Sequence, residues 1–391
     1  MNATELRFDS SDELLARVAW SRLIEPGDER ATTLIGQVGP AEALRALVER
    51  EVEWLQRFVP RLASLDPHRD LEGVRRLGGR VVLPSDDEWP AGFAALASPP
   101  PCLWVRGSVA LDEVAARSVA VVGARAATTY GEHVAGDIAC GLGERAFTVV
   151  SGLAYGIDGA AHRGALASGA VSVGVVAGGV DRAYPAGHDT LMTRLAERGA
   201  ILSEVPPGSA PTRGRFLQRN RLIAALSSGT VVVEAALRSG SLNTARTAAL
   251  LGRPVGAVPG PVTSVGSAGC HALLRDGVAV LVTDADEIAE LVGRMGEDAT
   301  PRRRGRAEPT DDLDPLAARV LDALPVRAGR PLDRVCATAG LDPASVQAAL
   351  GRLALLGLAE RDGPGWRVMR APIPRAAPHQ EQARRVVRGV D

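Results

Sequence analysis

The chain has 391 residues, a formal net charge of -1 and 46% hydrophobic residues. This length predicts two or three domains, with ample apolar side chains for their cores. The small net charge excludes a protein that attracts polyanions through its overall field, so any contact with nucleic acid has to come from a local basic patch. All 45 basic residues are arginines, which excludes a P-loop lysine and a Schiff-base lysine.

The four cysteines are far apart in the sequence and form no CxxC pair. This spacing predicts free thiols in a reducing cytoplasm, and neither a disulfide framework nor a zinc site. The N-terminal sequence has no basic region followed by an apolar core, and no apolar run approaches the length of about 18 residues that a membrane span needs. We therefore expect a cytoplasmic protein that is not inserted in a membrane.

Residues 1–75 are predicted to form a small helical domain of the sterile-alpha-motif or helix-hairpin-helix type. Apolar residues recur at helical spacing in DELLARVAWSRLI and in PAEALRALVEREVEWLQRFV, and turns rich in glycine and proline separate the two segments. Trp20 and Trp54 are interpreted as core residues of this domain, not as platforms for bases. The segment that follows has a strand-like RVVLP and an apolar strand at CLWVRG, with prolines that break any regular element between them, and it is interpreted as a connector laid on the next domain.

From Ser118 onward, apolar runs alternate with helix-compatible sequence. The runs are SVAVVG, FTVVSG, VSVGVVAGG, AILSEV, TVVVEA, RPVGAVPG and VAVLV. Apolar strands without two-residue alternation, separated by helices, predict a parallel sheet covered on both faces. We expect residues 76–292 to form an α/β domain with a Rossmann-like, doubly wound and mostly parallel sheet, whose ligand lies beyond the carboxyl ends of the strands.

Small and basic residues occupy the loops at these carboxyl ends. They are Gly123 and Arg125 after the first run, Ser151 and Gly152 after the second, Gly178 and Gly179 after the third, and Arg238, Ser239, Gly240 and Ser241 after TVVVEA. Glycine lets backbone amides approach an anion, and helix N-termini attract it, so these loops predict a phosphate-binding rim. The first loop is not GxGxxG and the chain has no GxxxxGK[ST] motif. We therefore expect neither a dinucleotide nor another cofactor.

A basic helix is predicted just before TVVVEA. The segment RGRFLQRNRLIAALSS, over residues 213–228, contains no acidic residue. Its apolar residues supply a buried stripe, and the guanidinium groups of Arg219 and Arg221 with the amide of Asn220 suit phosphate oxygens and base edges. The alternative is a solvated helix face without a ligand.

The C-terminal part is predicted to contain a linker, a domain and a tail. Glycine, proline and charge are concentrated over 293–314, which predicts a flexible linker. Three helical segments and two strands around DGPG predict a winged-helix domain over 315–370. Its candidate recognition helix, SVQAALGRLALL, exposes little beyond Gln347 and Arg352, so a protein contact is as well supported as base recognition. The tail over 371–391 is predicted to be disordered.

Five motifs resemble the DNA-processing protein A (DprA/Smf) family. They are VAVVGARAATTYG, SGLAYGIDGAAHRGAL, RNRLIAALS, VVVEAALRSGSLNTARTA and VPGPVTSVGSAGCHALLRDG, and their order and spacing match across residues 81–289. The resemblance implies a cytoplasmic protein that binds single-stranded DNA and has no established catalytic activity. It also implies a homodimer that protects incoming strands in natural transformation and loads the RecA recombinase onto them.

The residues and the resemblance together predict a site for single-stranded DNA and its phosphates, with no catalytic residue and no metal. The predicted binding residues are Gly123, Arg125, Ser151, Gly152, Arg215, Phe216, Arg219, Asn220, Arg221, Ser239, Gly240 and Ser241. Ala124 replaces the serine of the family's Gly-Ser-Arg loop, and Leu217 replaces a proline that many members have. His188 and His271 stand where the family commonly has asparagine, and we interpret both as hydrogen-bonding residues.

Three alternatives stay open. Asp158 and His162 lie one helical turn apart, a spacing that also suits a metal or acid-base pair, but we interpret them as a structural hydrogen-bonded pair. A nucleotide phosphoribohydrolase shares a Rossmann core and a glycine-rich strand-end loop, although Glu234 precedes the loop here and RSGSLNTA lacks a second acid. A winged-helix transcription regulator would depend on the C-terminal domain alone.

Overall fold

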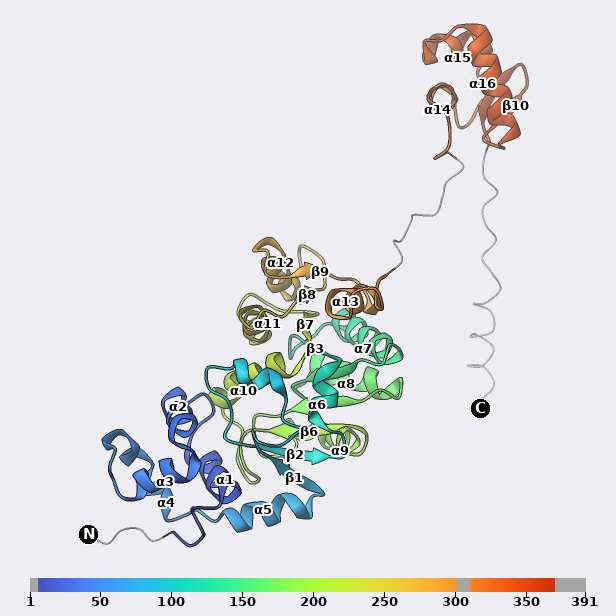
Figure 1. The fold of residues 1–391 in the computed structure, drawn as a ribbon. Helices are drawn as coiled ribbons and strands as arrows, with labels where there is room; N and C mark the ends of the chain where they lie inside the picture. Colours follow the sequence, from blue (N-terminus) through green and yellow to red (C-terminus); the bar gives the residue numbers. More distant parts are fainter. Residues whose placement is uncertain (1–5, 301–309, 370–391) are drawn as a thin grey trace, which may run out of the picture. The chain divides into compact units, whose positions relative to one another are not determined.

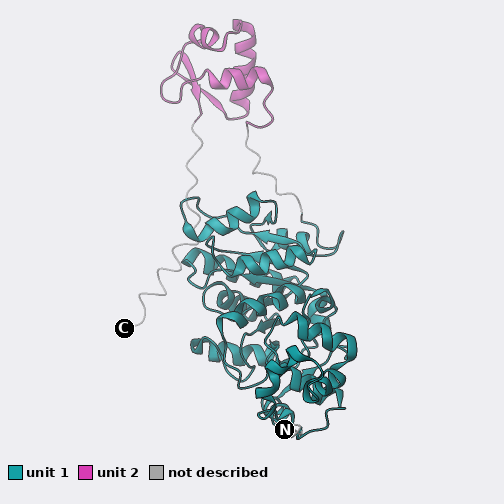
Figure 2. Ribbon diagram, turned by 90° about the vertical axis from the view of Figure 1, so that its left-hand side faces the viewer, with its two compact units in different colours: residues 1–300 teal, residues 301–391 magenta. Residues whose placement is uncertain are grey.

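The computed structural model describes residues 6–300 and 310–369, so the predicted tail and part of the predicted linker lie outside the described residues. The chain divides into two compact units, residues 1–300 and residues 301–391, which are described separately (Figure 2). Within the described residues, no helix is long and apolar enough to cross a membrane.

The first unit is built on a nine-stranded sheet in the order β1-β2-β6-β5-β4-β3-β7-β8-β9 (Figure 1). The strands are β1 (Gly79–Val82), β2 (Leu103–Gly107), β3 (Ser118–Val122), β4 (Thr148–Ser151), β5 (Ser172–Val175), β6 (Ala200–Ser203), β7 (Gly229–Val232), β8 (Val255–Ala257) and β9 (Val280–Leu281). Strands β3 to β9 are parallel, which confirms the predicted Rossmann-like sheet. β1 and β2 form an antiparallel edge. The interpretation of this segment as a connector is therefore wrong, because its two strands extend the sheet.

The strand order reverses between β3 and β7. After β3 the chain continues through β4, β5 and β6 on one side, and it then returns to β7, β8 and β9 on the other. The loops that leave β3 and β7 therefore diverge at their carboxyl ends. This divergence opens a crevice at the position where sheets of this type bind their ligands.

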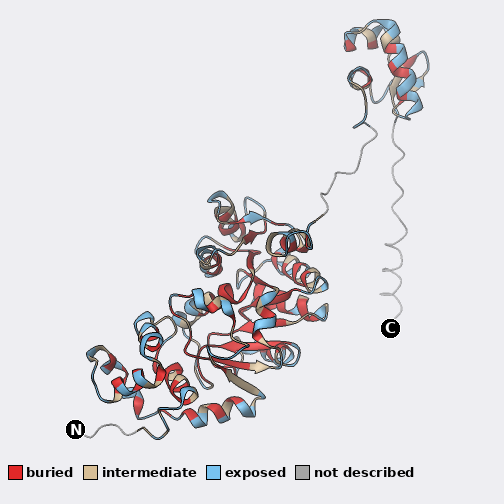
Figure 3. Ribbon diagram, viewed as in Figure 1, coloured by how far each residue is buried: buried red, intermediate tan, exposed pale blue. Residues whose placement is uncertain are grey.

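Alternate residues of the strands supply two cores, one on each face of the sheet (Figure 3). On β3, Val119 and Val121 pack on one face, and Ala120 and Val122 pack on the other. The helices of the first face are α7 (Thr129–Glu144), α8 (Ile157–Ala167) and α13 (Ala285–Val292). Those of the second are α6 (Leu111–Ala116), α10 (Arg213–Leu226), α11 (Ser241–Leu250) and α12 (Ala268–Arg275). Short 3-10 turns are η2 (Ala91–Ala95), η3 (Ala186–His188) and η4 (Val265–Ser267).

The N-terminal helices have a core of their own and share a second core with the sheet. They are α1 (Glu13–Leu23), α2 (Glu29–Val38), α3 (Pro40–Val48), η1 (Glu53–Phe58), α4 (Val59–Leu62) and α5 (Pro67–Arg76). Trp20 is fully buried and its indole N–H donates to the carbonyl oxygen of Pro40 at 2.9 Å, which confirms it as a core residue. Trp54 is only half-buried. Apolar side chains of α1 and α5 pack with Trp104 of β2 and with α9 (Asp189–Arg198).

The second unit is a winged helix. It consists of α14 (Pro315–Asp322), α15 (Leu332–Ala339), α16 (Pro343–Leu355) and the hairpin of β10 (Ala359–Asp362) with β11 (Gly365–Val368). Gly340 ends α15 in the left-handed conformation, with φ at 61°. Arg352 of the candidate recognition helix α16 forms an ion pair with Asp314 at 2.6 Å. Part of the charge that this helix presents is therefore already paired within the unit.

Candidate nucleic-acid interface

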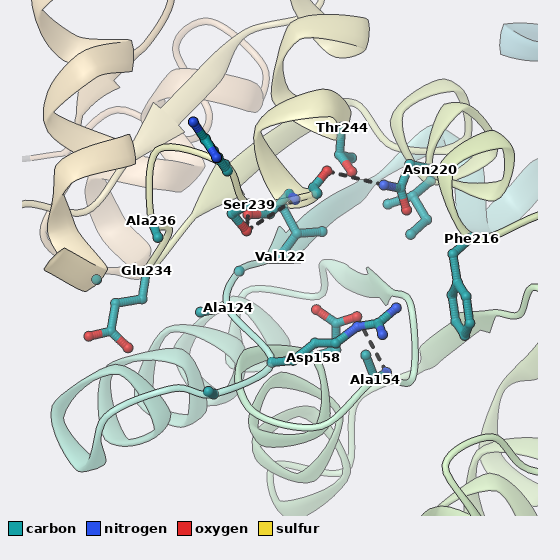
Figure 4. A pocket seen from close by; sticks show the side chains of 18 of the residues that line it. Val122, Ala124, Ala154, Asp158, Phe216, Asn220, Glu234, Ala236, Ser239 and Thr244 are labelled. Carbon is teal, nitrogen blue, oxygen red and sulfur yellow. Dashed lines mark hydrogen bonds between the residues drawn. The ribbon is translucent and has the colours of Figure 1, made fainter. Parts of the chain in front are cut away.

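A cleft of about 640 Å³ opens where the strand order reverses (Figure 4). Phe216 and Asn220 lie on one side of it, Glu234 and Ala236 lie on the other, and Asp158 lies between them. Of the predicted site residues, the structure brings together Gly123, Arg125, Phe216, Arg219, Asn220, Ser239, Gly240 and Ser241. Most of the predicted site residues therefore lie around one cleft, although they come from segments that are far apart in the chain.

Two exposed arginines border the cleft. Arg125 follows β3 and Arg238 follows β7, and neither forms an ion pair with any residue that the structure describes. The guanidinium carbon of Arg125 lies 4.4 Å from the ring centroid of Phe216, which is half-buried. This cation–π contact positions the charge at the mouth of the cleft without neutralising it. Arg238 lies in the predicted phosphate-binding rim, although it was not among the predicted binding residues.

Unpaired backbone amides add to this positive rim. The N–H groups of Arg125, Ala126 and Gly240 have no hydrogen-bond partner within residues 6–300. Gly240 directly precedes α11, whose N-terminus carries a partial positive charge. The hydroxyl groups of Ser239 and Ser241 are 2.8 Å apart in the same loop. Donors of these kinds suit the oxygens of a phosphate.

Glu234 occupies the start of α7. Its carboxylate accepts hydrogen bonds from the Thr128 backbone N–H at 2.9 Å and from the Thr128 hydroxyl at 2.8 Å. Thr128 in turn caps α7 by accepting from the Gly131 N–H at 3.1 Å. Because a carboxylate of the chain itself satisfies this helix end, α11 is left to attract an external anion. This role of Glu234 was not predicted, because every helix N-terminus at the carboxyl edge of the sheet was expected to attract a ligand anion.

Arg219 lies on the floor of the cleft and is only 6% exposed. It donates a hydrogen bond to the carbonyl oxygen of Val175, and its guanidinium covers Gly152 so closely that a Cβ there would collide with it. Burial lowers the pKa of Arg219 to about 10, while the charge of Asp158 opposes the shift. The side chain therefore stays cationic at neutral pH, with its Nε buried and unpartnered among the described residues.

Arg215 and Arg221 do not line this cleft. Arg221 donates to both carboxylate oxygens of Glu204, at 2.6 and 2.7 Å, and burial raises the pKa of that carboxyl group. Arg215 donates to both oxygens of Glu25, at 2.8 and 3.0 Å, across 190 residues of sequence. Each of these predicted phosphate ligands already has a carboxylate partner in the structure.

Ser151 and Gly152 do not line the cleft, whereas Asn220 lines it and holds one of its loops. The Ser151 hydroxyl donates to the carbonyl oxygen of Val121 at 2.6 Å in the buried sheet. The Asn220 amide donates to the carbonyl oxygen of Gly240 at 3.2 Å. Asn220 thus fixes the loop that presents the Gly240 N–H, and Ser151 and Gly152 lie under the cleft instead of lining it.

Asp158 and His162 are not hydrogen-bonded to each other, so their interpretation as a bonded pair is wrong. The Asp158 carboxylate accepts the Ala154 N–H at 3.4 Å, whereas His162 Nδ1 lies 2.8 Å from the Ser172 hydroxyl. Both side chains are buried, and burial raises the pKa of Asp158 and lowers that of His162 to about 3. The two side chains lie one turn apart on α8 and have different hydrogen-bond partners.

The other two histidines of interest are hydrogen-bonded, as interpreted. His188 Nδ1 lies 3.1 Å from the carbonyl oxygen of Leu153, and His271 Nε2 lies 3.1 Å from that of Gly260. Neither belongs to a metal site. Within residues 6–300 and 310–369, no group of three or more His, Cys, Asp or Glu side chains is arranged to hold a metal ion.

Two family models match the chain. Residues 80–293 match the model of the DNA recombination-mediator protein A, and residues 304–365 match that of the DprA winged helix domain. The chain is 49% identical over 385 residues to a putative DNA processing protein DprA of Mycobacterium tuberculosis, which covers 94% of this chain and 98% of that protein. It is 44% identical over 212 residues to protein Smf of Escherichia coli, covering 54% and 56% of the two chains.

A solved structure is also similar. The X-ray structure of DNA processing protein A from Streptococcus pneumoniae superimposes with a TM-score of 0.61 at 28% identity, over 74% of this chain and 100% of that chain. Its match agrees with the two family models, which together cover the sheet and the winged helix. The protein therefore belongs to the DNA processing protein A (DprA/Smf) family.

Proposed function

We propose that this protein binds single-stranded DNA in the cleft between the ends of β3 and β7. The observation that carries the proposal is the convergence of two exposed, unpaired arginines, Arg125 and Arg238, with the ring of Phe216 and the unpaired amides of the rim. The arginines and amides suit phosphate oxygens, and an aromatic ring suits a base. Membership of the DNA processing protein A family supports the same ligand.

A single strand suits these groups better than a duplex. An aromatic side chain can stack on a base only where that base is free of its duplex neighbours. The net charge of -1 also provides no general attraction to duplex DNA. Binding is expected to weaken steeply with salt and to depend little on base sequence, because phosphates supply most of the contacts.

The family resemblance also supports a finer proposal about the cellular role. The protein would act in the cytoplasm as a homodimer, protect incoming strands during natural transformation and load the RecA recombinase onto them. Sedimentation velocity tests the dimer, nuclease digestion of bound strands tests protection, and the rate of RecA filament formation on those strands tests loading. A monomer, unprotected strands or an unchanged filament rate would each contradict the corresponding part.

We further propose that the cleft binds without catalysis. A nucleotide phosphoribohydrolase would require a carboxylate free to act at the glycosidic bond, and the carboxylate of Glu234 is held by Thr128 at the start of α7. Incubation with nucleoside monophosphates is expected to release no free base. Release that is lost in Glu234→Gln would favour the enzyme.

Fluorescence anisotropy with a labelled oligothymidine, measured against salt, tests the DNA site. The variant Arg125→Ala with Arg238→Ala should bind more weakly, and its plot of log affinity against log salt should be shallower by about 1.4, since each single-strand phosphate contact contributes about 0.7. The matched control is Arg194→Ala with Arg198→Ala, two exposed arginines of α9 outside the cleft. Equal affinity of the two double variants would contradict the site.

A further inference from the structure

Two exposed tyrosines extend the aromatic surface of the cleft beyond Phe216. Tyr155 is 52% exposed and lies in the loop between β4 and α8. Tyr184 is 53% exposed and lies in the loop between β5 and η3. Both loops leave the same carboxyl edge of the sheet as the cleft does. We call Phe216, Tyr184 and Tyr155 the aromatic row.

The rings of the row lie close together although they come from three separate segments. The ring centroids of Tyr184 and Phe216 are 5.4 Å apart and the rings are tilted by 52°. A Cβ added to Gly187 would lie 2.7 Å from the Tyr155 hydroxyl, so Tyr155 rests on the loop that carries Tyr184. The Tyr155 ring also packs edge-on against His188, with centroids 4.9 Å apart. The row thus runs from the cleft across the ends of β4 and β5.

Packing in the hydrophobic core does not account for Tyr155 and Tyr184, because both side chains are half exposed. Elsewhere in the first unit, Trp20, Phe93, Trp104 and Phe147 are almost completely buried, as large aromatic side chains usually are. Tyr155 and Tyr184 form one row with Phe216 at the mouth of the cleft, and exposed apolar surface that is contiguous marks a ligand site more strongly than a single exposed ring such as Tyr130 does.

Cations flank the row on both sides. The guanidinium of Arg125 lies over Phe216 at one end. At the other end, Arg163 of α8 is exposed and forms no ion pair with a described residue, and its Nη1 and the His188 ring both lie beside Gly159. A row of rings with a cation at each end, neither of them in an ion pair with a described residue, matches the surface that proteins present to single-stranded nucleic acid, where bases stack and phosphates pair.

We propose that Tyr184 and Tyr155 stack on successive bases of a single strand that leaves the cleft across the ends of β4 and β5. The proposal rests on the proposed DNA-binding function and adds the direction that the strand takes from the cleft. Arg125 already covers one face of Phe216, so the outer faces of the two tyrosines are the surfaces left for bases. Every base has a stacking face, and the row therefore binds without reading sequence.

Anisotropy with two strands of equal length, oligothymidine and a fully abasic strand, separates stacking from phosphate binding. The variant Tyr155→Ala with Tyr184→Ala is expected to lose at least about 25-fold in affinity for oligothymidine, because each of the two stacked bases contributes about 5-fold or more, and none for the abasic strand. Its salt dependence should match the wild type, because no charge changes. Tyr155→Phe with Tyr184→Phe should bind both strands like the wild type.

The control for this experiment is Tyr130→Ala. Tyr130 is 46% exposed, donates its hydroxyl hydrogen to the carbonyl oxygen of Pro259 and lies outside the row, so its loss should leave both affinities unchanged. Wild-type affinity of the double alanine variant for oligothymidine, or an equal loss for both strands, would overturn the stacking proposal. The variant Arg125→Ala with Arg238→Ala tests the cleft separately, because it should lose affinity for both strands. If it does so while the tyrosine variant does not lose affinity, only the stacking proposal fails.

Discussion

The arginines of α10 and those of the strand-end loops are the same residue type in different surroundings. On α10, Arg219 is buried near Asp158, Arg221 is paired with Glu204 and Arg215 is paired with Glu25. In the loops, Arg125 and Arg238 are exposed and have no carboxylate partner among the described residues. A buried cation that loses its partner is costly, whereas an exposed one can meet a phosphate without breaking an ion pair. Basic residues on a helix therefore indicate a ligand site only if their side chains are exposed and lack carboxylate partners.

The largest expected effect that tests this contrast is on stability. Arg219→Ala removes a buried side chain, its hydrogen bond to Val175 and the cation that opposes the raised pKa of Asp158, so the free energy of unfolding should fall by about 2–5 kcal/mol. Urea denaturation followed by circular dichroism measures it. Arg213→Ala, at the exposed start of the same helix, is the control and should change stability by less than about 0.5 kcal/mol. Equal effects of the two variants would remove the distinction between buried and exposed arginines.

A methyl group at Gly152 is expected to have the next largest effect. It would meet the Arg219 guanidinium, so Gly152→Ala should lower stability by about 1–3 kcal/mol, as overpacking usually does. Gly36→Ala on α2 is the matched control, since an added Cβ meets nothing there and alanine favours a helix. The same denaturation experiment serves for both. A neutral Gly152→Ala would show that the guanidinium moves easily and is not part of a fixed floor.

The buried His162 of α8 should also make stability depend on pH. Burial, together with the charges of His188 and Arg219, lowers the pKa of His162 to about 3 in the folded state, against about 6.5 in the unfolded chain. The folded state therefore keeps His162 neutral while the unfolded state takes up a proton below pH 6.5. Its contribution is present above that pH and falls by about 1.4 kcal/mol between pH 7.5 and 5.5.

The variant His162→Gln isolates this contribution, because it removes this imidazole and leaves the other histidines in place. Unfolding measured at the two pH values should show a loss smaller by about 1.4 kcal/mol in the variant. The raised pKa of Asp158 acts in the opposite direction, and because Asp158 is present in both proteins, the difference between their losses does not include it. An identical loss in both proteins would place His162 in contact with water.

The smallest expected effect comes from releasing a paired arginine. Glu25→Gln removes the ion-pair partner of Arg215, so that its guanidinium can contact a phosphate as those of Arg125 and Arg238 can. Affinity for oligothymidine should rise by a factor of about two to five, because an exposed pair is worth less than about 1 kcal/mol. Glu29→Gln, an exposed acid of α2 without an ion-pair partner among the described residues, should leave affinity unchanged. An unchanged affinity in Glu25→Gln would place Arg215 off the path of the strand.

Much of the sheet could be predicted from the sequence because its signal is local. Uninterrupted apolar runs such as SVAVVG and TVVVEA form β3 and β7, and the loops after them line the cleft. Strands were predicted at RVVLP and CLWVRG, but their antiparallel pairing at the edge of the sheet was missed, since the proline-rich segment between them gives no sign of it.

The partners of the arginines could not be predicted, because they come from distant sequence. Glu25 meets Arg215 only once the turn between α1 and α2 is placed beside α10, and no pattern around either residue encodes that contact. The capping role of Glu234 depends on the distance between β7 and α7. The resemblance placed Arg219 at the right cleft, but burial on the floor is a property of the fold and not of its motif.

The core that α1 and α5 share with β2 and α9 limits how this chain can be divided. Leu15, Leu71 and Val74 cover Trp104, so a fragment that begins at β1 would present this apolar surface to water. Such a fragment is expected to aggregate even though all nine strands are present. The same contact means that substitutions in the N-terminal helices and at this edge of the sheet have to compensate each other during divergence. The helices before β1 therefore belong to the same structural unit as the sheet and do not form a separable domain.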